Sequence, residues 1–184
     1  MATSEHPLIL TLALDATSAA FFNELRQQHF PPERNYLDSH LTLFHQLPAA
    51  EIDSITATLE EISQQYHSLH TQVSEVRLLG RGVAYRIESR LLQQLHRQLQ
   101  KKWQPYLTAQ DQQRLWPHVT VQNKVDASVA QALHEQLSAD FEPFEAVGEG
   151  LRLWEYHGGP WRLQQSFAFK QQSSGTAQAT KSIS

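Results

Sequence analysis

The sequence predicts an α+β protein of two similar lobes, and two observations carry that prediction. A strand, a helix, a second strand and a second helix follow one another from Leu8 to Tyr66, and this order recurs from Val83 to Leu137. In both units the second strand carries the pattern His-x-Thr and is entered from a turn-forming stretch. Two such units can pack around a pseudo-twofold axis, which would bring the two equivalent strands together at the centre.

The first unit begins with Leu8 to Leu14, which is apolar on both faces and is therefore expected to be a central strand. The polar stretch Asp15 to Ser18 offers a helix cap, so a helix is expected from about Ala19 to His29, where two prolines follow. A loop then leads into the strand that carries His40. The next helix is expected after Pro48, because apolar residues recur there at helical spacing: Ile52, Ile55, Leu59 and Ile62.

The middle of the chain predicts a hairpin and a long helix. Thr71 to Leu79 and Val83 to Ile87 have the composition of strands, and glycines flank the turn between them. Ser89 is a suitable cap for a helix that ends at Pro105. The apolar face of that helix consists of Leu91, Leu92, Leu95, Leu99 and Trp103.

After the second His-x-Thr strand, a helix capped by Asp126 or Ser128 is expected. Two further strands, near Gly148 to Tyr156 and from Trp161 to Phe169, flank a turn that contains two glycines and a proline. The small polar residues 171–184 predict a disordered tail. Residues 1–170 are therefore expected to form one domain of two lobes.

Composition limits the classes of function. The formal net charge of −4 argues against non-specific binding to a nucleic-acid backbone, although a nucleotide or an RNA end can still be recognised in a local pocket. The chain has no cysteine, which excludes disulfides, a thiol nucleophile and a Cys-based zinc site. Neither a signal peptide nor a membrane-spanning stretch is evident. We therefore expect a soluble, cytoplasmic protein.

The two His-x-Thr stretches are Ser39-His40-Leu41-Thr42-Leu43 and Pro117-His118-Val119-Thr120-Val121. Successive side chains of a strand point to opposite faces, so each His shares a face with its Thr while the aliphatic residues face the core. With 10 His and 11 Thr in 184 residues, roughly 0.6 such matches are expected by chance, so the count alone is weak. The shared context is what favours a paired site over two unrelated, half-buried histidines.

A pair of imidazoles and hydroxyls suits the cleavage or formation of a phosphodiester without a metal. A neutral imidazole takes a proton from the attacking oxygen, while a protonated one gives a proton to the leaving oxygen. The Thr hydroxyls can donate hydrogen bonds to the non-bridging phosphate oxygens as negative charge develops there.

The two motifs, in a chain of this size, resemble the 2H phosphoesterase superfamily, and within it the bacterial proteins called 2′-5′ RNA ligase-like or RNA 2′,3′-cyclic phosphodiesterases. The resemblance spans most of Leu8 to Lys170, and Ser39 to Pro48 and Leu153 to Leu163 also look like one branch of the family. It implies a bilobal fold with two antiparallel sheets that face a central cleft and with helices on the outer faces. It also implies the following roles: acid and base for His40 and His118, phosphate binding for Thr42 and Thr120.

The resemblance further implies a metal-independent enzyme with no cofactor, whose partner is a small nucleotide or RNA end with a cyclic phosphate or a 2′-5′ linkage. We expect a monomer with no membrane contact. Members of the RNA cyclic phosphodiesterase branch often carry a basic residue soon after the second motif. Here Lys124 follows His118 by about 20 Å of extended strand and Gln122 by about 13 Å, so neither is expected to touch the phosphate. His45 is expected on the face opposite His40, in a structural role.

Other side chains are weaker candidates. Arg81 could bind phosphate, and Tyr85, Trp154 and Tyr156 could stack on a base, although strand aromatics usually belong to the core. The sequence thus predicts hydrolysis of a cyclic phosphodiester, such as the 2′,3′-cyclic phosphate of RNA or of a nucleotide. Two alternatives stay open: 2′-5′ RNA ligation through the same site, and a non-catalytic module that binds nucleotides or RNA ends.

Overall fold

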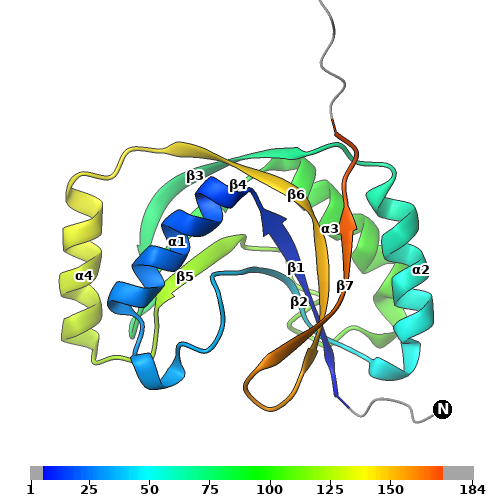
Figure 1. The fold of residues 1–184 in the computed structure, drawn as a ribbon, viewed down its shortest axis with the longest axis horizontal. Coiled ribbons are helices and arrows are strands. Elements are labelled where there is room, and N and C mark those ends of the chain that lie inside the picture. Colours follow the sequence, from blue (N-terminus) through cyan, green and yellow to red (C-terminus); the bar gives the residue numbers. More distant parts are fainter. Residues whose placement is uncertain (1–5, 172–184) are drawn as a thin grey trace, which may run out of the picture.

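The computed structural model describes residues 6–171. They contain seven strands and four α-helices, with short 3₁₀ turns at Pro32–Arg34, Ala49–Glu51 and Gln104–Tyr106 (Figure 1). In chain order the elements are β1 (Leu8–Leu14), α1 (Ala16–His29), β2 (Leu41–Leu47), α2 (Ile52–Ser63), β3 (Leu69–Leu78), β4 (Val83–Glu88), α3 (Arg90–Trp103), β5 (His118–Gln122), α4 (Ala127–Ala139), β6 (Phe144–Tyr156) and β7 (Trp161–Ala168).

The strands form one curled antiparallel sheet in the order β2-β1-β6-β3-β4-β5, with β7 added beside β6. The long strand β6 pairs first with β3 and then with β1 and β7. The expectation of two sheets is therefore corrected, because β6 is long enough to belong to both halves and joins them. Figure 1 shows β6 crossing the middle of the molecule.

The predicted repeat is confirmed by the strand order. Exchanging β1 with β4, β2 with β5 and β3 with β6 turns the order of the sheet into its own reverse. The two His-x-Thr strands, β2 and β5, occupy the two ends of that order. Because the sheet curls, they nevertheless come into contact with each other.

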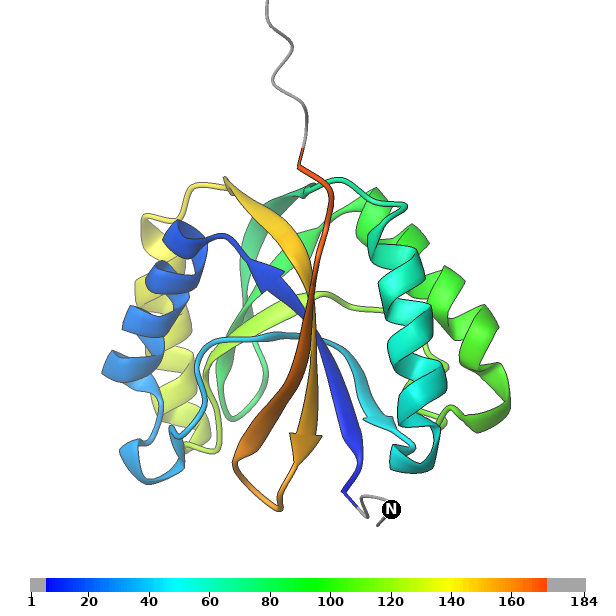
Figure 2. The ribbon, with the colours of Figure 1, turned by 45° about the vertical axis from the view of Figure 1, so that its right-hand side comes forward.

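The helices are exchanged between the two halves. On one side α1 packs against β5 and α4 packs against β3 and β4. On the other side α2 packs against β6 and β7, and α3 reaches β2 through a hydrogen bond between His96 and the carbonyl of Leu43. Figures 1 and 2 show these two helix pairs at opposite ends of the sheet. Each half is thus covered by one helix from each repeat, so the two lobes are interlocked.

Local sequence explains the helix starts. The carboxylate of Asp15 accepts a hydrogen bond from the Ser18 amide, and the hydroxyl of Ser89 accepts one from the Leu92 amide. The first helix consequently begins at Ala16 rather than at Ala19, since the residues after Asp15 already belong to its first turn. The final pair of strands is confirmed, but β6 begins earlier than expected, at Phe144, where it pairs with β3.

The predicted disordered tail lies, apart from Gln171, outside the described residues. Within residues 6–171, no helix is both long and apolar enough to cross a membrane.

Gly150 should be required for the pairing of β6 with β7. A Cβ at this position would lie 2.4 Å from the carbonyl oxygen of Phe167, which is backbone and cannot move aside. We expect Gly150→Ala to lower the free energy of unfolding by about 1–3 kcal/mol in urea denaturation. Gly159→Ala is the matched control, because its Cβ would meet nothing closer than 3.5 Å. Equal stability of the two variants would contradict the close approach of these strands.

Candidate active site

The same irregularity follows each His-x-Thr pair. Along β2, Thr42 pairs with Thr11 and Phe44 with Leu10, so Leu43 is an extra residue opposite β1. Along β5, Thr120 pairs with Ala84 and Gln122 with Val83, which leaves Val121 as the extra residue opposite β4. These are equivalent β-bulges, a device that redirects the side chains that follow it.

The bulges correct two expectations about faces. Leu43 and Phe44 are both buried, and so are Val121 and Gln122, so the strict alternation stops at these pairs. The next residues, His45 and Asn123, therefore return to the face of the His-x-Thr pairs. His45 was expected on the opposite face, and this was wrong because simple alternation takes no account of the extra residue.

His40 and His118 are held in the same way. The Nδ1 atom of His40 lies 2.8 Å from the carbonyl oxygen of Asp38, and Nδ1 of His118 lies 2.8 Å from that of Trp116. A carbonyl can only accept, so Nδ1 is the donor in each ring and Nε2 is the nitrogen left for chemistry. Each imidazole also packs on a tryptophan, with ring centroids 4.6 Å apart for His40 and Trp161 and 4.4 Å for His118 and Trp116.

Both imidazoles favour the neutral form in the free protein. Burial lowers the pKa of His40 to about 4, against a hydrogen bond to Asp38 that raises it, and the charges of Arg26, His118 and His45 lower it further. Burial also lowers the pKa of His118. A positive charge on His118 is among the causes that lower the pKa of His40.

A third histidine joins them. Nδ1 of His45 lies 3.1 Å from Oδ1 of Asp111, and the amides of His45 and Gln46 donate to the two carboxylate oxygens at 2.8 and 2.9 Å. Burial alone would raise the pKa of Asp111, but these hydrogen bonds keep it below its usual value. A charge on His45 lowers the pKa of His40 and of His118, so the His45 imidazole is electrostatically coupled to both. Its Nε2 is free for a ligand.

Arg26 is a charged residue near the site that no motif or spacing in the sequence singles out. Its side chain on α1 is buried, its Nη1 donates to the Thr120 carbonyl at 3.0 Å, and its Nε donates to Asn35. The guanidinium also lies over the ring of Phe30. Desolvation lowers the pKa of Arg26 to about 10, so it remains charged at neutral pH. Arg26 therefore positions the Thr120 strand and contributes positive charge beside His40.

One cavity, of about 230 Å³, brings the two motifs together. His40 from the first motif and Thr120 from the second both line it, with Lys124, Asn123 and Tyr156 around them. Lys124 was expected about 20 Å from His118 along an extended strand, but it lines the same cavity as His40 and Thr120. Strand β5 ends at Gln122 and Lys124 has a φ of 60°, so the chain turns back and distance along an extended strand does not apply.

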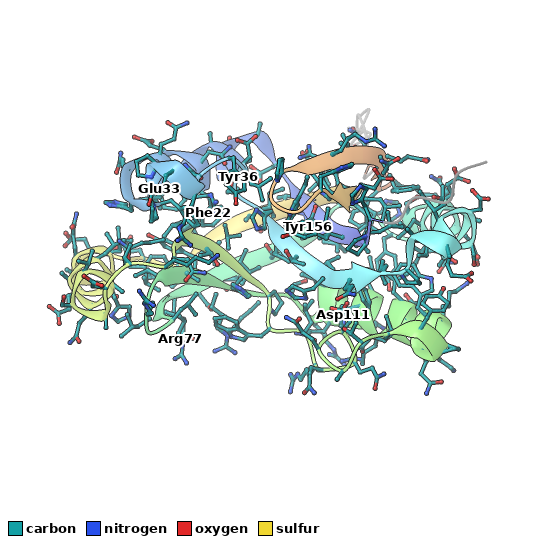
Figure 3. All side chains as sticks on the ribbon, turned by 90° about the horizontal axis from the view of Figure 1, so that it is seen from below. Phe22, Glu33, Tyr36, Arg77, Asp111 and Tyr156 are labelled. Atoms are coloured by element: carbon teal, nitrogen blue, oxygen red, sulfur yellow. The ribbon has the colours of Figure 1, made fainter. Side chains whose placement is uncertain are left out.

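The other predicted residues are divided between this region and other parts of the fold. Thr42 is half-buried next to Thr11 in the sheet, and Trp154 donates to the Thr11 hydroxyl in a second pocket beside His40. Tyr156 lies at the cleft, on the same side as Tyr36, whereas Asp111 lies toward α3, as Figure 3 shows.

Two of the substrate-binding candidates lie elsewhere. Tyr85 is 2% exposed and packs on Phe21, Phe22 and Phe141, so its predicted contact with substrate is wrong: it belongs to the core. Arg81 sits in the β3–β4 turn, where its Nε donates to the carbonyl of Val125 at 3.0 Å. Among residues 6–171, no three His, Asp or Glu side chains gather as metal ligands would.

Comparison with known proteins identifies a family for this chain and finds its fold in solved structures. A family model described as the 2′-5′ RNA ligase superfamily matches residues 14–160. A structure described as a phosphoesterase is 19% identical, with a TM-score of 0.60 over 91% of this chain and 100% of its own. The protein TT0787 of Thermus thermophilus is 13% identical, with a TM-score of 0.61 over 89% of this chain and 97% of its own.

Escherichia coli LigT complexed with 3′-AMP is 19% identical, with a TM-score of 0.60 over 91% of this chain and 100% of its own. LigT has also been crystallised with NADP+ and with ATP. At these identities the structural likeness shows the fold alone. No curated protein matches the sequence significantly.

The environment of His40 predicts an acid-sensitive fold. In the unfolded chain His40 takes up a proton near pH 6.5, whereas in the folded protein it does so near pH 4. Between these values the unfolded state binds more protons, so stability should fall as the pH drops from 6.5 to 4. NMR titration of the imidazole carbons should give a His40 pKa well below 6.5. In urea denaturation, His40→Asn should weaken the pH dependence, and an unchanged dependence would contradict this environment.

Proposed function

Since this chain belongs to the 2′-5′ RNA ligase superfamily, we propose that it is a phosphodiesterase that hydrolyses the 2′,3′-cyclic phosphate of a nucleotide or of an RNA end. The observation that carries the proposal is the matched pair of imidazoles. His40 and His118 have the same ring tautomer, each set by a carbonyl two residues earlier in the chain, and each leaves Nε2 free. Two such groups supply the base and the acid that opening a cyclic phosphate requires.

The proposed reaction breaks one P–O bond and forms another. One neutral imidazole takes a proton from a water molecule as the water oxygen attacks phosphorus. The other imidazole, protonated, gives its proton to the ribose oxygen that leaves, so the product is a 2′- or 3′-monophosphate. Each imidazole ends in the other's initial protonation state, and solvent exchange restores the pair.

The environment favours His40 as the base. Burial, and then the nearby guanidinium of Arg26, keep its imidazole neutral and ready to accept a proton at neutral pH. Arg26 does not lower the pKa of His118 to a comparable extent, since burial and His45 are what lower it. The negative charge of a bound phosphate would raise the pKa of both rings, and the ring with less opposing positive charge gains the proton more readily.

Several groups can hold the phosphate. The hydroxyls of Thr42 and Thr120 are the proposed donors to the non-bridging oxygens, one from each motif. Lys124 lines the same cavity as Thr120 and adds a positive charge. His45, oriented by the buried Asp111, offers a third Nε2 on this face. Asp111 acts here as a positioning residue, in the way that a carboxylate commonly orients a functional imidazole.

His40→Ala and His118→Ala should each lower kcat by about 10²-fold or more, the usual scale of lost acid–base catalysis. The assay follows release of a 2′- or 3′-monophosphate from a 2′,3′-cyclic nucleotide or a cyclic-ended oligonucleotide, in the presence of EDTA. His70→Ala is the control, because His70 pairs with Glu145 at the surface.

The outcomes separate the proposal from its alternatives. Near-wild-type turnover in both motif variants would overturn the mechanism. Tight binding of cyclic-ended substrate by the wild-type protein without turnover would indicate a non-catalytic module. Joining of two RNA ends through a 2′-5′ linkage, lost in both variants, would indicate a ligase.

The assignment of base and acid has its own test, in which sulfur replaces the leaving oxygen of the cyclic phosphate. A thiolate leaves without a proton, so the acid is no longer needed. On this substrate His118→Ala should recover about tenfold or more of its lost activity, while His40→Ala should remain as impaired as on the oxygen substrate. Recovery in His40→Ala alone would reverse the assignment.

A further inference from the structure

His40 lines one pocket, the two residues before His118 line another, and equivalent elements form part of both pockets. The pocket beside His40 has a volume of about 460 Å³ and is lined from β1, the start of α1 and the loop that precedes β2, and also from β6 and β7. The other, of about 700 Å³, is lined from β4, α3 and the loop that precedes β5, and it ends at Trp116 and Pro117, next to His118. The pseudo-twofold axis thus relates the strand, helix and loop that both cavities share, while the wall from β6 and β7 is found only in the pocket beside His40.

Their side chains are nevertheless different. The pocket beside His40 contains the rings of Tyr36, Trp154 and Trp161 and a single guanidinium group, that of Arg152. The pocket beside His118, here called the arginine pocket, contains four guanidinium groups: Arg86, Arg90, Arg97 and Arg114. The pseudo-symmetry makes Arg86 equivalent to Ala13, Arg90 to Ala16 and Arg114 to Tyr36, so none of these three arginines has a charged counterpart in the first repeat.

One of the four arginines forms salt bridges within the described residues, and the other three do not. Arg86 pairs with Glu75 at 3.0 Å and with Glu88 at 3.2 Å. Arg90, Arg97 and Arg114 form no salt bridge with any carboxylate of residues 6–171. Arg90 and Arg97 are seven residues apart on α3 and therefore lie on one face of that helix. On a chain with a net charge of −4, this is a local concentration of positive charge.

The chemistry of the pocket matches phosphate. Guanidinium groups form paired hydrogen bonds with phosphate oxygens, and several of them in one groove attract a polyanion more strongly than surface lysines do. Trp116 lines the pocket, is 38% exposed and packs its ring on His118, so the pocket is separated from the imidazole of the second motif by one aromatic ring.

We propose that the arginine pocket binds a second phosphate of the substrate, separate from the cyclic phosphate that is cleaved. The inference rests on the proposed function and narrows its substrate class to molecules that carry a further phosphate close to the cyclic end. A cyclic-ended oligonucleotide provides one as its last internucleotide phosphate, and a cyclic mononucleotide provides one only when it is 5′-phosphorylated.

The test compares three substrates: adenosine 2′,3′-cyclic phosphate with a free 5′-hydroxyl, the same compound with a 5′-phosphate, and the 3′-5′-linked dinucleotide ApA with a 2′,3′-cyclic phosphate end. For the wild-type protein, kcat/KM should be higher for the second or third than for the first. The preference ratio is kcat/KM for the second or third substrate divided by kcat/KM for the first. In the triple variant Arg90→Gln, Arg97→Gln, Arg114→Gln, this ratio should fall about tenfold or more, as expected for lost charged hydrogen bonds. The ratio should also fall with increasing salt in the wild type.

Lys101→Gln is the matched control, because it removes one positive charge from α3 at a residue that does not line the pocket. Its ratio should equal that of the wild type. Preference for the dinucleotide would identify an RNA end as the substrate. Preference for the 5′-phosphorylated compound alone would identify a nucleotide as the substrate. Equal kcat/KM for all three substrates, or a ratio unchanged in the triple variant, would overturn the inference. Lack of turnover of every substrate by the wild type would instead overturn the proposed function.

Discussion

The backbone pairing of β6 is the interaction on which the rest of the structure depends. Its first residues pair with β3 and the following ones with β1 and β7, so one ladder of hydrogen bonds carries both repeats. A slip of one residue against either neighbour would turn Leu151 and Leu153 out of the core. Because β2 and β5 lie at the two ends of the sheet, their approach is determined by the curl of every strand between them.

The helices exchanged between the two halves also hold the two motif strands in place. Arg26 on α1 donates to the carbonyl of Thr120, a residue of the second motif. Nε2 of His96 on α3 contacts the carbonyl of Leu43, a residue of the first. Both contacts reach main-chain oxygens at or beside the bulges, where a strand loses regular partners. Each repeat therefore stabilises the motif strand of the other, and neither half of the site is complete without the opposite helix.

The pattern of residues predicted the part of the site that follows from strand alternation, and no more. His40 and Thr42 share a face because one residue separates them, which holds before the bulge. Beyond it, the extra residue reverses the phase, so His45 could not be placed without the pairing of β1 and β2. Asp111 could not be associated with His45 either, because the contact joins residues far apart in the chain. Tyr85 looked like any strand aromatic, and only the packing of Phe22 on α1 and of Phe141 after α4 shows that it belongs to the core.

The backbone of the site is pseudo-symmetric but its side chains are not, and this difference can fix the orientation of a bound substrate. The pseudo-twofold axis gives both imidazoles the same tautomer and the same free nitrogen, so geometry alone does not distinguish acid from base. The surroundings do. The buried guanidinium of Arg26 lowers the pKa of His40. Four guanidinium groups line the pocket beside His118, whereas the pocket beside His40 has one, that of Arg152. A substrate with a base at one end and a phosphate at the other would fit such a cleft in a single orientation. That orientation would also decide which of the two oxygens of a cyclic phosphate faces the protonated imidazole and leaves.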